Sequence, residues 1–195
     1  MRSALRIARS AWRVGFWHSA GAAFRFLRQV VLQHGVSSDG FVNIQPRAFI
    51  LVEPEARLVI GRHVQLKNDA IVYVKRGATL TISDNVSLGH HAEVSVNQDV
   101  RIGADTFTAP YVYITDSNHR FDRIDVPIQS QPMDVRPTAI GRDVWIGRGA
   151  MVLAGAQVGD HCVLGAGAIV TRTHAPGDLV VGIPGRTVRN RFKGG

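Results

Sequence analysis

An aliphatic residue returns at every sixth position through the C-terminal half of the chain. The series has no gap over six hexads: Ile140, Ile146, Val152, Val158, Leu164 and Val170. The fifth position of each hexad is small or β-branched: Val144, Ala150, Ala156, Cys162 and Ala168. A period of six fits neither an amphipathic helix nor a simple alternating strand. It predicts a solenoid in which each hexad forms one flat face and both positions point inward.

The same register occurs earlier in shorter runs. These are Ile60–Leu66–Val72, Ile82–Leu88–Val94 and Ile102–Thr108–Ile114. Glycine often follows the aliphatic residue, as at Gly61, Gly89, Gly103, Gly141, Gly147, Gly159 and Gly165, where we expect it to relax the backbone at a corner. Three hexads would make one coil, and stacked coils would pair their strands in parallel. The pattern therefore predicts an all-β fold, a left-handed parallel β-helix of hexapeptide repeats.

Two segments lie outside this rhythm. Residues 116–138 contain three prolines and no hexads, which predicts a long protruding loop, and loops of this length are more often functional than decorative. Residues 3–33 space their apolar residues as a helix does. We therefore expect a basic amphipathic helical arm or cap in residues 1–36, followed by a β-helix domain in residues 37–195.

The net charge of +8 is unevenly distributed, because residues 1–34 carry six arginines and no acidic residue. Two compatible roles follow for the arm. It could cap the open edge of the first coil, or make peripheral contact with an anionic membrane. The chain has no apolar stretch long enough to span a bilayer and no signal-peptide pattern, so we expect a cytoplasmic location. Basic residues are not interleaved with a stacking platform, so a nucleic-acid partner is not expected.

Metal chemistry is not expected either. The single cysteine, Cys162, excludes an internal disulfide and a cysteine-based zinc site. His90 and His91 are neighbours, and neighbouring residues of a strand point to opposite sides. His119 has no second histidine at the spacing that a metal-binding pair would need.

His119 differs from the other histidines by its position. It follows the run that ends at Ile114 and opens the long loop, so a rigid strand could hold it while it faces a cleft. Neutral histidine is the natural base for deprotonating a hydroxyl near pH 7. A histidine that only anchors the loop is the alternative interpretation.

Four ordered segments carry a resemblance to a known family. They are Thr115–Arg123 (TDSNHRFDR), Ile140–Gly147 (IGRDVWIG), Val163–Arg172 (VLGAGAIVTR) and Val181–Arg189 (VGIPGRTVR). Together they resemble the hexapeptide-repeat acetyltransferases, in particular the galactoside/maltose acetyltransferase group and its polysaccharide-biosynthesis branch. The resemblance covers about residues 43–191 and leaves out the arm.

The resemblance implies a role for each matching residue. His119 would be the catalytic base, and Asn97 and Trp145 would contact the acceptor. Asn97 stands where galactoside acetyltransferases carry an acidic residue, which argues against a simple β-galactoside acceptor. The acetyl-CoA contacts would be Arg148, Ala166, Thr171, Arg172, Arg186 and Arg189. The family also implies a homotrimer with the cleft between subunits.

The predicted function is therefore O-acetyl transfer from acetyl-CoA, as co-substrate, to a hydroxyl of a saccharide or glycan precursor. Two alternatives stay open. An amino sugar could be N-acetylated by the same base and donor, or the chain could be a non-catalytic β-helix scaffold.

Overall fold

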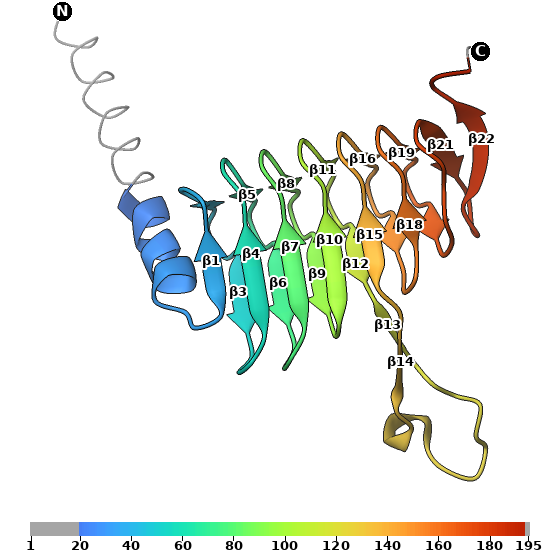
Figure 1. Ribbon diagram of the computed structural model, residues 1–195, viewed down its shortest axis with the longest axis horizontal. Coiled ribbons are helices and arrows are strands. Elements are labelled where there is room, and N and C mark those ends of the chain that lie inside the picture. The colour runs from blue at the N-terminus through green and yellow to red at the C-terminus, as the bar shows by residue number, and fades with distance from the viewer. Residues whose placement is uncertain (1–19, 194–195) are drawn as a thin grey trace, which may run out of the picture.

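The computed structural model describes residues 20–193, which form a three-sided parallel β-helix (Figure 1). The first face has six strands: β1 (Val36–Ser38), β4 (Arg57–Ile60), β7 (Thr79–Ile82), β10 (Asp99–Ile102), β15 (Thr138–Ile140) and β18 (Gln157–Val158). The second face has eight: β2 (Asn43–Ile44), β5 (Gln65–Leu66), β8 (Ser87–Leu88), β11 (Phe107–Thr108), β16 (Trp145–Ile146), β19 (Val163–Leu164), β21 (Asp178–Val181) and β22 (Arg186–Asn190). The third face has six: β3 (Phe49–Val52), β6 (Ile71–Val74), β9 (Glu93–Val96), β12 (Tyr113–Thr115), β17 (Met151–Val152) and β20 (Ile169–Val170).

Every aliphatic position of the hexad series lies inside the prism, as predicted. Ile140, Ile146 and Val158 are at most 4% exposed, and the fifth-position residues such as Cys162 are fully buried. Equivalent residues stack on one another along the axis, since Ile102 is in register with Ile140. The core is therefore a column of small and aliphatic side chains, and the predicted parallel β-helix is confirmed.

The glycines that follow the aliphatic positions serve a different purpose from the one expected. Backbones with positive φ do occur at the corners, but mostly in other residues, such as His63 and Tyr111. A Cβ at Gly103 would instead lie 2.5 Å from the carbonyl carbon of Gly141 in the next coil, and Gly147 is equally crowded by backbone. These glycines are required by close approach between coils.

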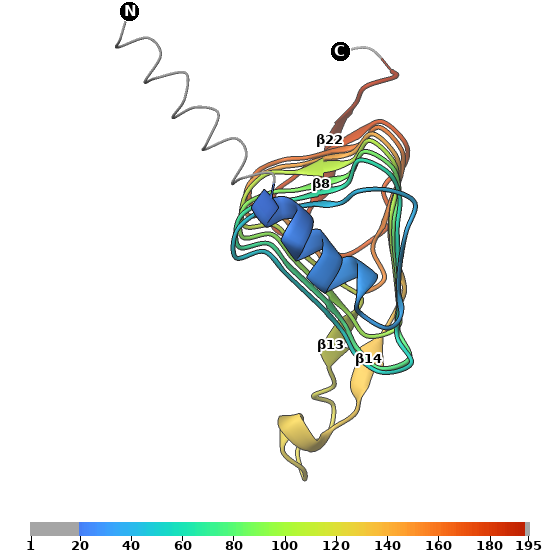
Figure 2. The same cartoon turned by 90° about the vertical axis from the view of Figure 1, so that its left-hand side faces the viewer.

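The described part of the arm covers the N-terminal end of the prism (Figure 2). Residues 20–26 are α-helical and continue into a short π-helix, η1 (Leu27–Val31). The side-chain amide of Gln29 donates to Ala48 O at 3.1 Å and accepts the N–H of Ile50 at 2.8 Å. Arg25 donates to Ile44 O at 2.6 Å. The helix thus satisfies backbone groups of the first coil that have no strand beside them.

The remainder of the predicted arm, residues 1–19, lies outside the described residues. The division between residues 1–36 and 37–195 therefore stays a prediction. Within the part of the chain that the structure describes, no helix is both long and apolar enough to cross a membrane.

The segment without hexads leaves the prism between β12 and β15 and projects from it (Figure 1). Its base is not irregular, because β13 (Ser117–His119) and β14 (Met133–Val135) pair as an antiparallel ribbon. A single 3-10 turn, η2 (Ile128–Ser130), lies near its tip.

Candidate active site

The projecting segment begins at the corner between the third and first faces, and a buried carboxylate fixes it there. Asp116 is fully buried. Its two oxygens accept the backbone N–H groups of Asn97, Gln98 and Asp99 at 2.7–2.8 Å. Because these three donors belong to the corner of the preceding coil, Asp116 joins that corner rigidly to the start of the ribbon. Hydrogen bonds to an ionised acceptor are the stronger kind.

The other strand of the ribbon is fixed at the same place. Arg136 donates its N–H to the carbonyl oxygen of Asp116 at 2.8 Å. Thr138 is buried and donates its hydroxyl to Thr115 O at 3.0 Å. Both chains of the ribbon are therefore tied to the β-helix where they leave it.

His119 is the last residue of β13, paired with Met133, and its side chain is exposed. It lines an open hollow of about 1260 Å³ together with Asn97, Gln98, Phe121 and Arg136. The structure thus brings together His119 and Asn97, which the sequence analysis assigned to the base and the acceptor contact. Among the described residues no side chain hydrogen-bonds to the imidazole.

The Asn97 side chain is held in one orientation. Its amide nitrogen donates to the Ser117 hydroxyl at 2.6 Å. This bond leaves the amide oxygen of Asn97 free to accept a hydrogen bond in the hollow.

Charged residues of the projecting segment pair among themselves. Arg120 binds Asp122 at 2.8 Å, Arg123 binds Asp125, and Arg136 lies 3.3 Å from Asp134. Each arginine lowers the pKa of its partner where the two share a hydrogen bond, as for Asp122 beside Arg120. All these pairs are exposed, so they contribute little to stability.

Trp145 does not line this hollow within one chain. It lies on the second face, 48% exposed, and stacks on Phe107 with ring centroids 6.1 Å apart. The hollow is at the corner between the other two faces. Any contact between Trp145 and an acceptor bound beside His119 therefore requires a second subunit.

Three of the predicted acetyl-CoA contacts gather near the corner between the second and third faces. Arg148 lies over the ring of Tyr111, 4.8 Å from its centroid. The next coil places the exposed Ala166 beside it, since Gly167 donates its N–H to Arg148 O. Arg186 reaches the same region, because its neighbour Gly185 donates to Ile169 O at 2.7 Å.

The other three predicted contacts are more widely spread. Thr171 and Arg172 are exposed directly after β20, on the corner from which the ribbon projects two coils earlier. Arg189 pairs with Leu179 and so lies at the far end of β22 from Arg186. The predicted contacts thus surround the C-terminal coils without meeting at one point.

Four polar residues of these regions were not predicted from the sequence: Asp116, Ser117, His174 and Asp178. Asp116 and Ser117 precede His119 in the motif Thr115–Arg123 that carries the resemblance. Their position in this motif was the signal that could have identified them. His174 and Asp178 occupy the last coil, where the hexad rhythm had already ended. Among residues 20–193, no three His, Cys, Asp or Glu side chains cluster closely enough to hold a metal ion.

A parallel β-helix whose core positions recur every six residues is the architecture of the hexapeptide-repeat class. Residues 137–172 match the family described as bacterial transferase hexapeptide (six repeats). Hexapeptide repeats of this family are thus present in the chain, and relatives that it matches are named acetyltransferases.

Two relatives illustrate the relationship. A Mycobacterium tuberculosis protein named probable acetyltransferase is 34% identical over 169 residues, which are 86% of this chain and 56% of the relative. The galactoside O-acetyltransferase of Escherichia coli is 29% identical over 123 residues, 60% of this chain and 57% of that protein. The chain spans somewhat more than half the length of these curated relatives.

The fold is also seen in a solved structure, the hexapeptide-repeat acetyltransferase of Vibrio cholerae in complex with acetyl coenzyme A. It is 21% identical, with a TM-score of 0.56 over 88% of this chain and 77% of that one. At this identity the likeness concerns the fold.

Proposed function

We propose that this chain transfers an acetyl group from acetyl-CoA to a hydroxyl of a saccharide or glycan precursor, with His119 as the general base. The observation that carries the proposal is the placement of His119. It is an exposed imidazole on a rigid ribbon, in a hollow shared with Asn97, in a chain whose relatives are named acetyltransferases. A scaffold would not need a fixed, solvent-facing histidine at this place.

In the proposed reaction His119 takes the proton of the acceptor hydroxyl as that oxygen bonds to the thioester carbonyl carbon. The carbon–sulfur bond then breaks, and the CoA sulfur leaves and receives the proton. A positioned base of this kind contributes roughly 10²–10⁴ in rate. The free amide oxygen of Asn97 would accept a hydrogen bond from a second hydroxyl of the acceptor, which orients it beside His119.

The donor would lie along the C-terminal coils. Ala166 and the adjacent glycines keep that surface low, so that a thin pantetheine arm could meet backbone amides. The phosphates need fixed positive charge. Arg148, Arg172, Arg186 and Arg189 are exposed around these coils and are the residues that would supply it.

The acceptor can be identified by its product. Purified protein would be incubated with acetyl-CoA and a panel of neutral sugars and amino sugars, and thiol release would be followed. Mild hydroxylamine cleaves O-acetyl esters and leaves N-acetyl amides intact, so it separates the two acceptor classes. We expect a hydroxylamine-labile product. A stable product would favour the N-acetyltransferase alternative, and absence of both CoA binding and thiol release would favour a scaffold.

We further propose that the chain works as a homotrimer in which Trp145 of one subunit approaches the hollow of the next. The exposed stack of Phe107 and Trp145 on the second face supports this, because large apolar patches on a surface mark interaction sites. Mixing inactive His119→Ala with Trp145→Ala subunits should restore part of the activity if Trp145 acts across subunits. No restoration, in mixtures shown to exchange subunits, would contradict the shared site.

Membrane contact through residues 1–34 is a separate proposal. In the described part of this segment, Phe24, Leu27 and Val31 are 47–63% exposed. Exposed apolar side chains combined with arginines are typical of a helix that lies in a membrane interface. Removal of residues 1–19 together with replacement of Phe24, Leu27 and Val31 by serine retains the capping residues Arg25 and Gln29. This variant should not co-sediment with anionic vesicles, and unchanged sedimentation would leave the arm as a cap alone.

A further inference from the structure

The last coil replaces two core positions with ionisable residues. His174 pairs with Val158 on the first face, where the preceding coils point an aliphatic side chain inward. Asp178 is in register with the buried Cys162, since the next residues, Val163 and Leu179, are paired. The His174 and Asp178 side chains are only 3% and 10% exposed. The C-terminal end of the prism is therefore closed by a polar pair instead of an apolar layer.

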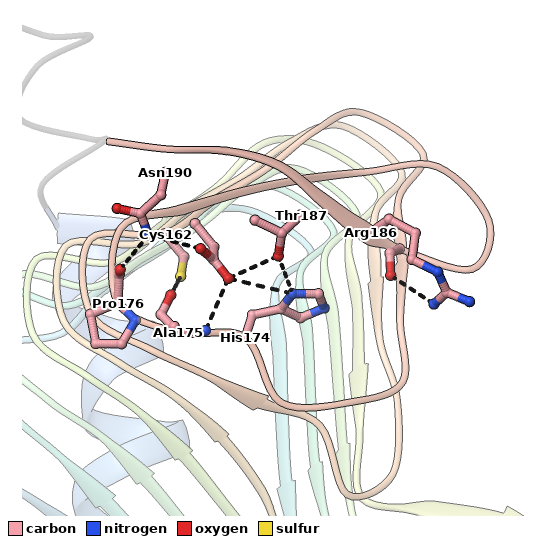
Figure 3. A network of polar contacts seen from close by, with 9 residues as sticks. Cys162, His174, Ala175, Pro176, Arg186, Thr187 and Asn190 are labelled. Carbon is pink, nitrogen blue, oxygen red and sulfur yellow. Dashed lines mark hydrogen bonds and ion pairs between the residues drawn. The ribbon is translucent and has the colours of Figure 1, made fainter. Parts of the chain in front are cut away.

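This pair forms a hydrogen-bonded chain with Thr187 of β22 (Figure 3). The Thr187 hydroxyl donates to Asp178 Oδ2 at 2.8 Å. A hydroxyl has one proton, so its 3.1 Å contact with His174 Nδ1 must be accepted from the imidazole. His174 therefore carries a proton on Nδ1. Its buried Nε2 has no partner among the described residues.

Asp178 also holds two other segments. It accepts the backbone N–H of Ala175 at 3.0 Å and the side-chain amide of Asn190 at 2.8 Å. Burial by itself would raise the pKa of Asp178, but the donors Asn190, Thr187 and Ala175 outweigh burial and lower it. The carboxylate is therefore ionised and binds both Thr187 and Asn190, one on either side of Arg189.

Strand β22 depends on these contacts more than other strands do. It is the end of the second face and pairs only with β21, through a ladder that contains an irregularity at Leu179/Val180. The turn before β22 is attached to the prism by Gly185, whose N–H donates to Ile169 O. The far end of the strand is attached by Arg191, whose N–H donates to Gly177 O at 2.7 Å. Between these two points, the side chains of Thr187 and Asn190 anchor the strand to the prism, and both bind Asp178.

The arginines predicted to bind donor phosphates lie around this anchor. Burial lowers the pKa of His174 most, Asp178 opposes that effect, and the positive charges of Arg172 and Arg186 lower the pKa further. These are the charged groups near the ring, and they come from the turn after β20, from β21 and from β22. Arg172 and Arg186 are therefore close enough to His174 for their charges to act on it.

We propose that Asp178, His174 and Thr187 form a positioning clamp that holds β22 so that Arg186 and Arg189 face the phosphates of the acyl-CoA donor. The proposal rests on the donor assigned under the proposed function. An aliphatic pair would close the core equally well, whereas directional hydrogen bonds fix one placement of the strand. A buried polar group that selects a single register is the best-attested use of such groups.

The test compares donors with and without phosphates. Thr187→Val keeps the shape of the side chain and removes the hydroxyl, and Thr187→Ser restores it. We expect Thr187→Val to weaken CoA binding about fivefold, the usual consequence of losing one hydrogen bond, as measured by calorimetry. The kcat/KM for acetyl-pantetheine, which lacks the nucleotide phosphates, should stay unchanged. Val188→Ala, at an exposed residue of the same strand, is the matched control and should bind CoA as the wild type does.

A double-mutant cycle completes the experiment. Because the clamp acts through Arg186 and Arg189, Thr187→Val should add little to the loss caused by replacing both arginines with alanine. Unchanged CoA affinity in Thr187→Val, an equal loss with acetyl-pantetheine, or full additivity with the double arginine variant would overturn the clamp. Wild-type protein that binds no CoA would overturn the proposed function as well, and that failure is seen before any variant is made.

Discussion

At the scale of single residues, Asp116 is the clearest case of a side chain that organises the site without facing it. A fully buried carboxylate that accepts three backbone N–H groups holds the corner of one coil against the start of the ribbon. His119 is three residues further along the chain, at the end of β13. The placement of its backbone therefore depends on Asp116.

Asp116→Asn should lower the free energy of unfolding by about 2 kcal/mol, because charge-assisted hydrogen bonds are replaced by a mismatched amide. Urea denaturation measures this loss. The exposed Asp122→Asn is the control and should change stability by less than about 0.5 kcal/mol. Equal stabilities for the two variants would show that Asp116 is not an anchor.

Glycine makes a second prediction at this scale. Gly103→Ala forces a Cβ against the backbone of Gly141, and we expect it to cost about 3 kcal/mol, at the upper end of the range for overpacking. Gly77 has φ +73° with open space around it, so Gly77→Ala should cost about 1 kcal/mol. Denaturant unfolding of both variants measures the difference. A larger loss at Gly77 would restore the conformational explanation that the sequence alone favours.

The sequence was sufficient to predict which hexad positions are buried, because the six-residue period is visible among residues close together in the chain. It was insufficient for Asp116 and Asp178, whose donors come from residues far away in the chain or from a reversed strand. No local pattern distinguishes a buried carboxylate from a solvated one. The glycines were located correctly, but their reason depends on the neighbouring coil, which the sequence does not display.

At the scale of elements, the N-terminal helix shows how an open end of a β-helix is closed. Gln29 reaches the backbone of both Ala48 and Ile50, and it is 9% exposed. The helical spacing of apolar residues led us to predict a cap. It did not identify the side chains that contact the first coil.

Gln29→Ala should lower the free energy of unfolding by about 2 kcal/mol, since it leaves a buried carbonyl and a buried N–H without partners. Thermal or urea unfolding provides the measurement. Arg28→Ala, at an exposed neighbour, should be nearly neutral. If both variants unfold like the wild type, the helix does not stabilise the β-helix through these contacts.

The C-terminal strand pair makes a prediction about pH. Burial and the nearby arginines hold the pKa of His174 below its ordinary value, so folding favours the neutral ring. This contribution to stability is fully present above about pH 6.5, the pKa of the unfolded histidine, and is lost as the pH falls toward the folded pKa.

The measurement compares the wild type with His174→Asn, whose amide can replace the Nδ1 donor and does not titrate. Between about pH 8 and about pH 5.5 the wild type should lose more free energy of unfolding than the variant. Equal losses of free energy of unfolding in the wild type and the variant would mean that the pKa of His174 is the same in the folded and unfolded states.

At the scale of the whole molecule, the three faces separate the groups that the proposed reaction needs. The hollow with His119 and Asn97 lies at the corner between the third and first faces. Arg148 and Ala166 lie at the corner between the second and third faces, and Trp145 lies on the second face. In the proposed reaction, one chain would provide the base and a surface for the donor. The repeat predicted this prism, whereas the distribution of site residues over its corners became visible only when the coils were stacked.

We propose His119 as the base of an acetyl transfer from acetyl-CoA. The most direct measurement is the rate of acceptor-dependent thiol release by the wild type, by His119→Ala and by His63→Ala, an exposed corner histidine remote from the hollow. We predict a loss of roughly 10²–10⁴ for His119→Ala, with CoA binding retained and His63→Ala unaffected. An equal rate in wild type and His119→Ala would show that His119 is not the base.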